Sequence, residues 1–354
     1  MKVYLRSGLR DLKPYKANDV PYRIKMDANE SPYDLPGVVK KQLARELLED
    51  SGLNLYPDSD AAVLRESISG YCKVHPDEII VGAGSDELIQ VIINAFIDRG
   101  EMVLYPDPSF GMYGIFTRIA GGIPVEVPLN DDFSYDTDGF HKAIEQHKPK
   151  LIFICSPNNP TGNILELDRL RGLLENFNGI VVVDEAYGEF CSHSAIEYIA
   201  QYPNLVVLKT FSKAMGLAGL RIGYLIANKG LVEQISIVKP PYNVSSISQR
   251  AARLVLENID IIRERISKIV AERERLYGKL SRMNGISVYP SNTNFLLLKA
   301  NGAGKICERL MQEGILVRSF AGNGRLKDCL RVTVGTAENN DTFLQVLEQI
   351  LRGQ

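Results

Sequence analysis

Lys213 lies in a segment whose residues could carry nucleophilic chemistry. It follows the apolar run 205–208, which predicts a buried strand, and it stands next to Ser212. Arg221 and a second apolar run, 222–227, come shortly after it. Between two buried strands an amine loses its proton more easily than in water and becomes a nucleophile. A solvated loop lysine has the same local pattern, so the neighbouring features must distinguish the two interpretations.

A glycine-rich turn is the second chemical feature. The sequence VGAGSDE at 81–87 has the pattern of a strand, a glycine turn and the start of a helix. Glycines let the backbone approach a ligand closely, free N–H groups at a helix start bind phosphate, and Ser85 suits an N-cap position. Because the carboxylates of Asp86 and Glu87 repel an anion, backbone groups would have to hold it. An ordinary strand-to-helix turn is also typical of this pattern.

Two more polar segments follow predicted strands. The sequence CSPNNPTG at 155–162 contains two X-Pro turns that fix the backbone and present an asparagine amide. The sequence VVVDEAY at 181–187 ends a buried strand on Asp184. A buried carboxylate needs a cationic partner, and neither lysine nor arginine is near in sequence. A protonated ring nitrogen of a bound cofactor would serve, and so would a distant arginine.

All four features fall at the carboxyl ends of predicted strands, where α/β sheets bind their ligands. Together they describe a site for pyridoxal 5′-phosphate. Lys213 would form the Schiff base, and Asp184 would keep the pyridine nitrogen protonated. Ser212, Arg221 and backbone N–H groups would hold the phosphate. Each feature is weak alone, and it is the set, in this order on one sheet, that indicates the cofactor.

The elements that must position these residues form an α/β pattern. Helix-period stretches or turns separate most of the short apolar runs, which predicts a parallel or mixed sheet with helices on both faces. The seven runs are 79–81, 102–105, 124–127, 151–155, 180–183, 205–208 and 222–227.

The rest of the chain is predicted to form an arm and a smaller α+β domain. Prolines and aromatic residues in 1–35 indicate an arm without regular structure that packs with the small domain and the active site. Charges at helical spacing in 245–283 predict an exposed helix that bridges two domains. We therefore expect a large cofactor-binding domain at 36–245, and the bridging helix with the small domain at 246–354. Further predicted elements are helices at 38–49, 61–72, 303–313 and 338–351 and strands at 286–289, 295–298, 315–318 and 330–334.

Composition excludes several classes of partner. The 41 basic and 43 acidic residues give a net charge of −2, which argues against a nucleic-acid or membrane-surface partner. No apolar run is long enough to span a membrane, and the N-terminus lacks the features of a secretory signal. The five cysteines never have CxxC spacing, which is typical of reduced thiols in a cytoplasmic protein. The four histidines have no metal-ligand spacing, so no metal is expected.

The motif set resembles the fold-type I pyridoxal-phosphate aminotransferases, and more narrowly the histidinol-phosphate aminotransferases. The resemblance runs from the sequence DANE at 27–30 to the sequence CLRVTVGT at 329–336. It implies a mostly parallel seven-stranded sheet, a pyridoxal 5′-phosphate cofactor and a homodimer with shared active sites. It also implies amino transfer between histidinol phosphate and 2-oxoglutarate, yielding imidazole acetol phosphate and glutamate, in histidine biosynthesis.

The same resemblance assigns roles to single residues at the cofactor. Lys213 would carry the cofactor and shuttle a proton between the substrate Cα and the cofactor C4′, and Asp184 would pair with the pyridine nitrogen. Asn159 and Tyr187 would bond the phenolic oxygen. The other implied cofactor contacts are Ser85 and Asp86 through their backbone, Ser212, Arg221, Phe110 through ring stacking, and Tyr56 from the partner subunit. Some relatives have tyrosine in place of Phe110, and phenylalanine keeps the stacking face but not the hydroxyl.

For the substrate, the resemblance implies Arg331, the arginine that holds a carboxylate in ordinary aminotransferases. Arg318 and the arm residue Tyr15 would join it on a phosphate ester, and Asn29 would also contact the substrate. Two forked guanidinium groups suit a dianion better than one. Arg318 could instead be a surface arginine at a strand end, and Tyr15 a hydrophobic anchor of the arm.

Three other functions share these features. An aromatic aminotransferase acting on phenylalanine or tyrosine could use the same arginine for a carboxylate. A threonine-phosphate decarboxylase has a closely similar sequence and would release carbon dioxide without an amino acceptor. A cofactor-binding regulator usually carries an added nucleic-acid-binding module, and the arm is too short and too weakly basic to be one.

Overall fold

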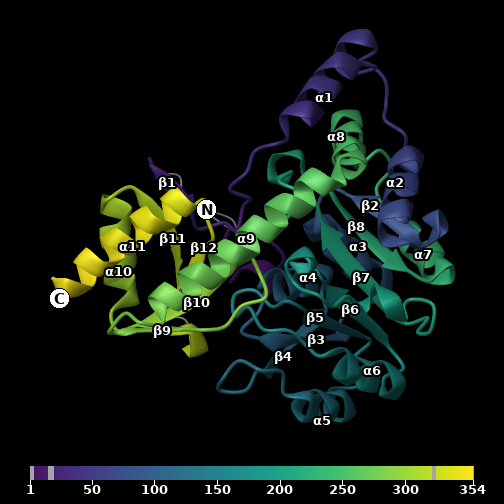
Figure 1. The fold of residues 1–354 in the computed structure, drawn as a ribbon. Helices are drawn as coiled ribbons and strands as arrows, with labels where there is room; N and C mark the ends of the chain where they lie inside the picture. The colour runs from purple at the N-terminus through teal and green to yellow at the C-terminus, as the bar shows by residue number, and fades with distance from the viewer. Residues whose placement is uncertain (1–3, 15–19, 321–323, 354) are drawn as a thin grey trace.

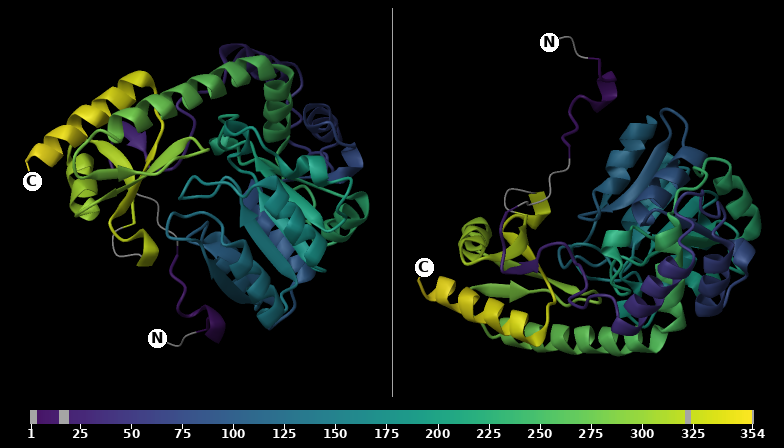
Figure 2. Two further views of the ribbon diagram at one scale, coloured as in Figure 1. Left: turned by 60° about the horizontal axis from the view of Figure 1, so that its bottom comes forward. Right: turned by 90° about the horizontal axis from the view of Figure 1, so that it is seen from above.

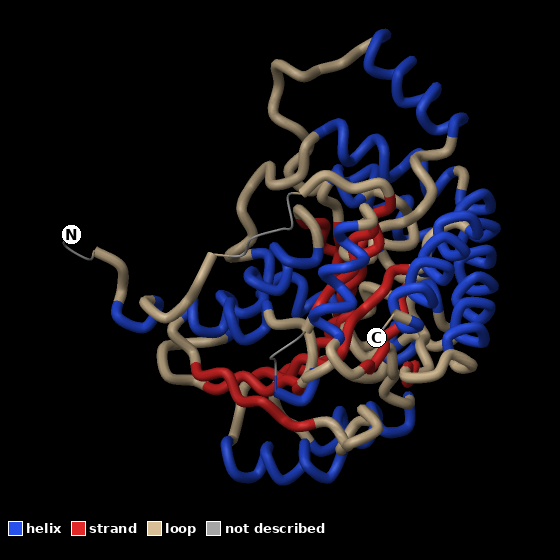
Figure 3. The backbone as a smooth tube through the Cα atoms, turned by 90° about the vertical axis from the view of Figure 1, so that its left-hand side faces the viewer, coloured by secondary structure: helices blue, strands red, loops and turns tan. Residues whose placement is uncertain are grey.

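The large part of the molecule is built on a seven-stranded sheet, as the sequence predicts. The structure is a computed structural model that describes residues 4–14, 20–320 and 324–353. The strand order is β2-β8-β7-β6-β5-β3-β4, and β8 alone runs antiparallel to its neighbours. Figure 3 shows these strands surrounded by helices. The strands are β2 (Ile79–Gly82), β3 (Met102–Asp107), β4 (Ile123–Pro128), β5 (Leu151–Cys155), β6 (Ile180–Asp184), β7 (Leu205–Thr210) and β8 (Gly223–Ala227).

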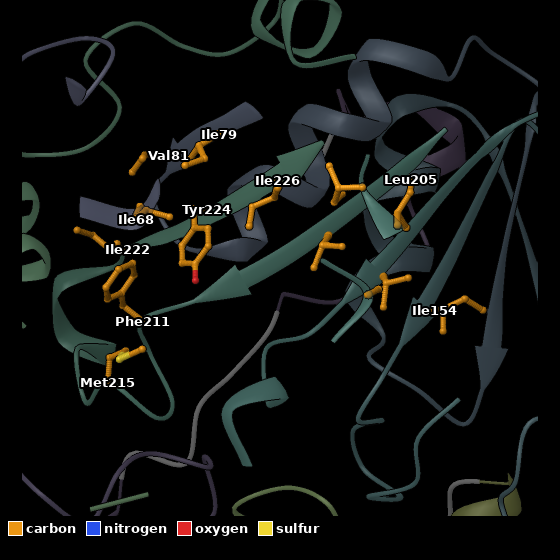
Figure 4. Packing of buried hydrophobic residues seen from close by; sticks show 14 of the residues in the cluster. Ile68, Ile79, Val81, Ile154, Leu205, Phe211, Met215, Ile222, Tyr224 and Ile226 are labelled. Atoms are coloured by element: carbon orange, nitrogen blue, oxygen red, sulfur yellow. The ribbon is translucent and has the colours of Figure 1, made fainter. Parts of the chain in front are cut away.

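Alternating apolar side chains fill both faces of this sheet. On β5, Ile152 and Ile154 point into one core, whereas Leu151 and Phe153 point into the other. Figure 4 shows the first of these cores. Its covering helices are α1 (Gly37–Glu49), α2 (Ala62–Cys72), α5 (Thr137–His147), α6 (Leu167–Asn176) and α8 (Ser246–Glu257). The second core is covered by α3 (Ser85–Phe96), α4 (Met112–Ala120) and α7 (Lys229–Ser236).

The single bridging helix predicted over 245–283 is wrong, because two helices occupy this segment. Helix α8 packs on α1 and α2, and α9 (Ile259–Leu280) begins a new direction after Asn258. The Asn258 side chain donates to the carbonyl oxygen of Leu254, and its backbone (φ −113°, ψ 33°) leaves the helical region. Thus only α9 crosses toward the smaller sheet (Figure 1).

The charges predicted to lie along the bridging helix form ion pairs on α9. Lys268 pairs with Glu264 at 2.6 Å, and Arg275 pairs with Glu272 at 2.8 Å. The predicted domain boundary between residues 245 and 246 stays a prediction, and α8 packs with the helices of the large sheet.

The smaller part is an α+β layer, with the strand order β1-β11-β12-β10-β9. The side chains of α9, α10 and α11 join the strands in one apolar core. The strands are β1 (Ile24–Met26), β9 (Ile286–Val288), β10 (Phe295–Ala300), β11 (Ile315–Ser319) and β12 (Cys329–Thr333), and the helices are α10 (Ala303–Gln312) and α11 (Ala337–Arg352). Short 3-10 helices are η1 (Ser7–Leu9), η2 (Pro76–Glu78), η3 (Gly188–Phe190), η4 (Ala195–Tyr198), η5 (Ala218–Leu220) and η6 (Gly324–Leu326).

The prediction that the arm lacks regular structure is wrong for β1. This strand runs parallel to β11, with Ile24 opposite Ile315, and it buries Ile24 and Met26 in the small core. Two alternating apolar residues are too few to indicate a strand, so the partner strand supplies the structure. The arm then passes between the two parts of the molecule (Figure 2).

Over the described ranges of the chain, none of the helices is both long enough and apolar enough to cross a bilayer.

Candidate active site

The four predicted chemical segments lie at one edge of the large sheet. Strands β2, β5, β6 and β7 run in the same direction, so their carboxyl ends meet there. The glycine turn follows β2, Asn159 follows β5, Asp184 ends β6 and Lys213 follows β7. The fold therefore gathers at this edge the residues that sequence spacing alone keeps apart.

The amine of Lys213 is held by the arm. Its Nζ donates to the carbonyl oxygen of Ala28 at 3.0 Å and lies 5.9 Å from the centre of the Tyr187 ring. Burial, with the nearby charge of Arg331, lowers the pKa of Lys213 to about 8. A sizeable fraction of the amine is therefore neutral near physiological pH, as a nucleophile requires.

Asp184 is a buried carboxylate held by two hydrogen bonds. Oδ2 accepts from the hydroxyl of Tyr113 at 2.7 Å, and Oδ1 accepts from the N–H of Ala186 at 3.0 Å. Burial raises its pKa to about 6. Within the described residues, the hydrogen-bond donors to this carboxylate are a hydroxyl and a backbone N–H, and not the distant arginine that the sequence left possible. Asp184 keeps capacity to accept a further N–H, because a carboxylate has about four acceptor positions.

Tyr187 and Asn29 form a buried pair. The Nδ2 of Asn29 donates to the hydroxyl oxygen of Tyr187 at 2.8 Å, and the Thr333 hydroxyl donates to Asn29 Oδ1 at 3.1 Å. Asn29 is 1 % exposed, and its backbone adopts φ 54°. Its side-chain oxygen and nitrogen therefore both form hydrogen bonds inside the protein. Burial raises the pKa of Tyr187 to about 12, so its own proton stays in place at neutral pH. Because the Tyr187 oxygen already accepts from Asn29, its O–H can donate to a ligand.

Arg331 connects the arm to the large sheet. Nη1 donates to Oδ1 of Asn159 and Nη2 donates to the carbonyl oxygen of Asp27, both at 2.6 Å. Its guanidinium also lies 5.2 Å from the centre of the Phe295 ring. Since the Asn159 oxygen is used in this way, its NH₂ group is the part that could donate to a ligand.

Arg318 lies directly opposite Arg331 on the neighbouring strand. The two Cα atoms are partners in the antiparallel β11–β12 register, so both side chains leave the same face. Like charges placed opposite each other repel, and an anion between them would remove the repulsion. This pair has the charge and forked geometry for a phosphate or carboxylate group.

The glycine turn is shaped by Arg221. Gly84 has φ 87°, and a Cβ there would lie 2.7 Å from Nη2 of Arg221, so only glycine fits. Arg221 Nη1 donates to the Ser212 hydroxyl at 3.2 Å, and Nη2 pairs with Asp86 at 3.3 Å. Arginine, serine and helix start thus meet at one corner, where the Asp86 carboxylate pairs with the arginine.

The interpretation of Ser85 as an N-cap is wrong by one residue. Gly84 is the N-cap of α3, and Ser85 is its first helical residue. The cap carries no side-chain hydrogen bond, so backbone N–H groups remain the donors of this helix start. Glu87 turns back toward the residue before the cap, where its carboxylate accepts from the N–H of Ala83 and from Nδ2 of Asn243, both at 2.6 Å.

Aromatic residues complete the surroundings. The partly buried ring of Phe110 meets Tyr113 edge-on, with 5.6 Å between ring centres. Tyr56 is 81 % exposed and stacks on Tyr242 at 4.6 Å. Tyr15 lies outside the described residues.

Sequence reasoning missed Tyr113. Its signal was present in the string PSFGMY at 108–113, where it has the spacing of a core aromatic on a helix. A buried carboxylate suggests a cationic partner, whereas the donor here is a neutral hydroxyl from another element. The spacing of Tyr113 therefore predicted packing and gave no sign of its hydrogen bond.

These residues fit pyridoxal 5′-phosphate. Asp184 offers a buried carboxylate to a protonated ring nitrogen, Lys213 offers a nucleophilic amine, and the corner at Arg221 offers donors to a phosphate. The described residues contain no group of three or more histidine, cysteine, aspartate or glutamate side chains that could hold a metal ion.

Comparison with known proteins identifies the family. The model of the aminotransferase class I and II family matches residues 22–347. A histidinol-phosphate aminotransferase of Ruminiclostridium cellulolyticum is 48 % identical over 349 residues, which cover 98 % of each chain. The chain belongs to the histidinol-phosphate aminotransferases.

Solved structures of related enzymes have the same fold. The histidinol-phosphate aminotransferase of Sinorhizobium meliloti, solved in complex with pyridoxal-5′-phosphate, has a TM-score of 0.89 at 25 % identity and covers 100 % of this chain and 99 % of its own. An L-threonine-O-3-phosphate decarboxylase of Porphyromonas gingivalis has a TM-score of 0.81 at 26 % identity. The match covers 93 % of this chain and 100 % of the decarboxylase chain. Histidinol-phosphate aminotransferases thus share their fold with a decarboxylase, and the fold alone does not define the reaction.

Proposed function

We propose that this aminotransferase moves an amino group between histidinol phosphate and 2-oxoglutarate in histidine biosynthesis, with pyridoxal 5′-phosphate as cofactor. The observation that carries the choice of substrate is the pair formed by Arg318 and Arg331, opposite each other on β11 and β12. Two guanidinium groups on one face suit the two negative charges of a phosphate ester. Tyr15 would add a hydroxyl to this group.

The cofactor, when bound, supplies a carbonyl carbon open to amines and a protonated ring that withdraws electrons. Asp184 would keep the ring nitrogen protonated, since a carboxylate beside it favours the charged ring. The hydroxyl of Tyr187 and the NH₂ group of Asn159 would hold the phenolic oxygen. The phosphate would be held by the backbone N–H groups of Ser85 and Asp86 together with Ser212 and Arg221, and Phe110 would stack on the ring.

Lys213 would bind the cofactor covalently and then act as the acid and base of the reaction. After the substrate amine has taken its place on the cofactor, the released amine of Lys213, partly neutral near pH 8, would take a proton from the substrate Cα and return it at the cofactor C4′. The bond to the Ala28 carbonyl oxygen holds the amine beside the Tyr187 ring.

The proposed assembly is a homodimer with shared active sites. The segments 48–63 and 237–242 expose large apolar side chains and lie side by side, since Lys239 Nζ donates to the Ser59 carbonyl oxygen at 3.0 Å. Exposed apolar patches of this kind mark interfaces. The residues are Leu48, Leu53, Leu55, Tyr56, Val63, Ile237, Val238 and Tyr242. A second copy would cover them, and Tyr56 would reach the phosphate in the partner's site. The cytoplasmic location stays a prediction.

A half-reaction tests the substrate. The cofactor-loaded enzyme is mixed with histidinol phosphate and its visible absorbance is followed. We expect the visible absorbance to bleach rapidly at a low concentration of histidinol phosphate and to recover when 2-oxoglutarate is added. Bleaching by phenylalanine but not by histidinol phosphate would instead identify an aromatic aminotransferase. Carbon dioxide release from threonine phosphate without any amino acceptor would identify a decarboxylase.

A further inference from the structure

Asp184 depends on a neighbour outside the expected cofactor contacts. The hydroxyl of Tyr113, on α4, donates to Oδ2 of Asp184 at 2.7 Å. We propose that Tyr113 is a positioning residue: its hydroxyl holds the Asp184 carboxylate ionised and oriented toward the ring nitrogen of the cofactor. The inference rests on the proposed function, because it concerns the residue that pairs with that nitrogen.

The packing around Tyr113 places its hydroxyl beside the Asp184 carboxylate and the Cys155 thiol, and the carboxylate is the hydrogen-bond partner at 2.7 Å. The side chain is fully buried, and its ring stacks on Phe153 with 4.7 Å between centres and 11° between planes. The Phe110 ring contacts the same ring edge-on, with an angle of 82° between the two ring planes. The Thr117 hydroxyl bonds to the Tyr113 carbonyl oxygen at 2.7 Å, which ties the next turn of the helix to this residue. A ring packed this way keeps its hydroxyl oxygen within hydrogen-bond distance of the carboxylate.

The two hydrogen bonds to Asp184 come from different elements and fix different carboxylate oxygens. The N–H of Ala186 fixes Oδ1 through the backbone of the strand end itself. Tyr113 comes from another element and fixes Oδ2. Both donors stabilise the ionised carboxylate against the cost of burial, because the charged form accepts strongly on both oxygens. Removing the hydroxyl therefore favours the protonated acid, which cannot keep the ring nitrogen protonated.

Other titratable groups bear on the same carboxylate. Burial is the largest influence on Asp184, and the charges of Asp86 and Glu185 also raise its pKa. The interacting titratable groups on the surrounding elements are Tyr113, Tyr135, Tyr187, Cys155, Asp86 and Glu185. Of these side chains, the hydroxyl of Tyr113 is the one that lowers the pKa of Asp184.

The test is Tyr113→Phe in the cofactor-loaded enzyme, with Tyr105→Phe as matched control. Both changes delete one tyrosine hydroxyl that donates to a carboxylate: Tyr113 donates to the buried Asp184, and Tyr105 donates to the exposed Glu126 at 3.0 Å. Both keep the aromatic ring, so folding is preserved and is checked by thermal unfolding. Three quantities are measured: the dissociation constant of the cofactor, the pH dependence of kcat/KM, and kcat and KM for histidinol phosphate.

For Tyr113→Phe we expect the dissociation constant of the cofactor to rise about tenfold or more, as for loss of a hydrogen bond to a charged group. The acidic limb of the pH profile should move to higher pH by about one unit, because the acid form of Asp184 is favoured. We expect kcat to fall about tenfold, with KM changing less than about twofold, because the arginine pair is untouched. The Tyr105→Phe variant should match the wild type.

Wild-type cofactor affinity and pH profile in Tyr113→Phe would overturn the proposal and leave Tyr113 as a packing residue. Equal losses in Tyr105→Phe would also overturn it. Cofactor affinity is measured without an amino donor, so this result is independent of the substrate. If the wild-type enzyme ignores histidinol phosphate while Tyr113→Phe still weakens cofactor binding, the proposed function fails and the role of Tyr113 stands.

Discussion

At the scale of single residues, Asp184 and Lys213 are both less charged than they would be in water. Burial is the largest cause for each, raising the pKa of Asp184 to about 6 and lowering that of Lys213 to about 8. The protein therefore carries unfavourable charge where a cofactor would bind. A protonated ring beside Asp184 and a covalent bond to Lys213 would each relieve that cost, which favours binding.

We expect Asp184→Asn to abolish catalysis and yet to stabilise the cofactor-free protein. A carboxyl whose folded pKa is raised from 3.8 to about 6 costs up to about 3 kcal/mol when ionised. That cost is complete above pH 6 and disappears as the pH falls toward 3.8. Thermal unfolding at about pH 7.5 should give the variant a midpoint a few degrees higher, with a smaller difference near pH 5. A lower midpoint at the higher pH would contradict this account.

The amine of Lys213 should react at unusually low pH. Its pKa of about 8 means that it is protonated below this value and nucleophilic above it. In cofactor-free protein, an amine-directed reagent should label Lys213 with a midpoint near pH 8, read by mass spectrometry of the peptide. The exposed Lys229, whose pKa is raised by Asp77, is the internal control and should need a far higher pH. Equal pH dependence at both lysines would refute the prediction.

The positions of some site residues could be predicted from the sequence, whereas the contacts of others could not. Lys213 and Asp184 could be predicted because each follows a run of apolar residues that marks a strand end. The substrate contact of Asn29 stays a prediction, and the sequence did not predict the bonds of its side chain to Tyr187 and Thr333. Contacts between residues so far apart in the chain exist only after folding, and no local pattern encodes them.

At the scale of elements, the β11–β12 register pairs Arg318 with Arg331, the two arginines proposed to bind the substrate. We expect Arg318→Gln to raise the KM for histidinol phosphate about a hundredfold, because one partner of a charged contact is lost. Turnover of phenylalanine, which has no phosphate, should change much less. Arg325→Gln is the matched control: it removes a guanidinium of the small part that contacts the Asn130 carbonyl oxygen at 2.8 Å. Equal effects of both variants on histidinol phosphate would argue against the arginine pair.

A second element-scale feature is the buried lysine at the end of β7. Lys209 lies 3.1 Å from both Glu185 and Glu189, and all three side chains are nearly inaccessible. Lys209→Met leaves two carboxylates without a cation, and we expect a loss of about 3–5 kcal/mol in urea unfolding. The exposed pair of Lys229 and Asp77 provides the control, and Lys229→Met should change little. Similar stability of the two variants would show that the buried cluster is not held by its lysine.

Strand positions in the large sheet could be predicted because short apolar runs between polar turns are typical of buried strands. The run 151–155 has the same bounds as β5, and the other runs differ by one or two residues at their ends. The strand β1 could not be predicted, since its stability comes from β11 at the other end of the chain. The break at Asn258 was hidden because helix-forming residues flank it on both sides.

At the scale of the whole molecule, the apolar patch at 48–63 and 237–242 predicts dimerisation. We expect Leu55→Asp to shift sedimentation toward the monomer and to lower activity, because Tyr56 would lose its place in the partner's site. Ile123→Asp changes another large exposed side chain, on the edge strand β4, and should leave the dimer intact. A monomeric wild type, or an unchanged Leu55→Asp variant, would contradict the proposed assembly.

The pairing of β1 with β11 also sets an order of assembly during synthesis. Ile24 meets Ile315, so the small sheet cannot close until nearly the whole chain has been made. The large sheet, from β2 to β8, is contiguous and contains Asp184 and Lys213. Because domains fold as units during translation, the half of the site that meets the cofactor can form first. In this order of assembly, the residues proposed to hold the cofactor would be in place before the arginines proposed to select the substrate.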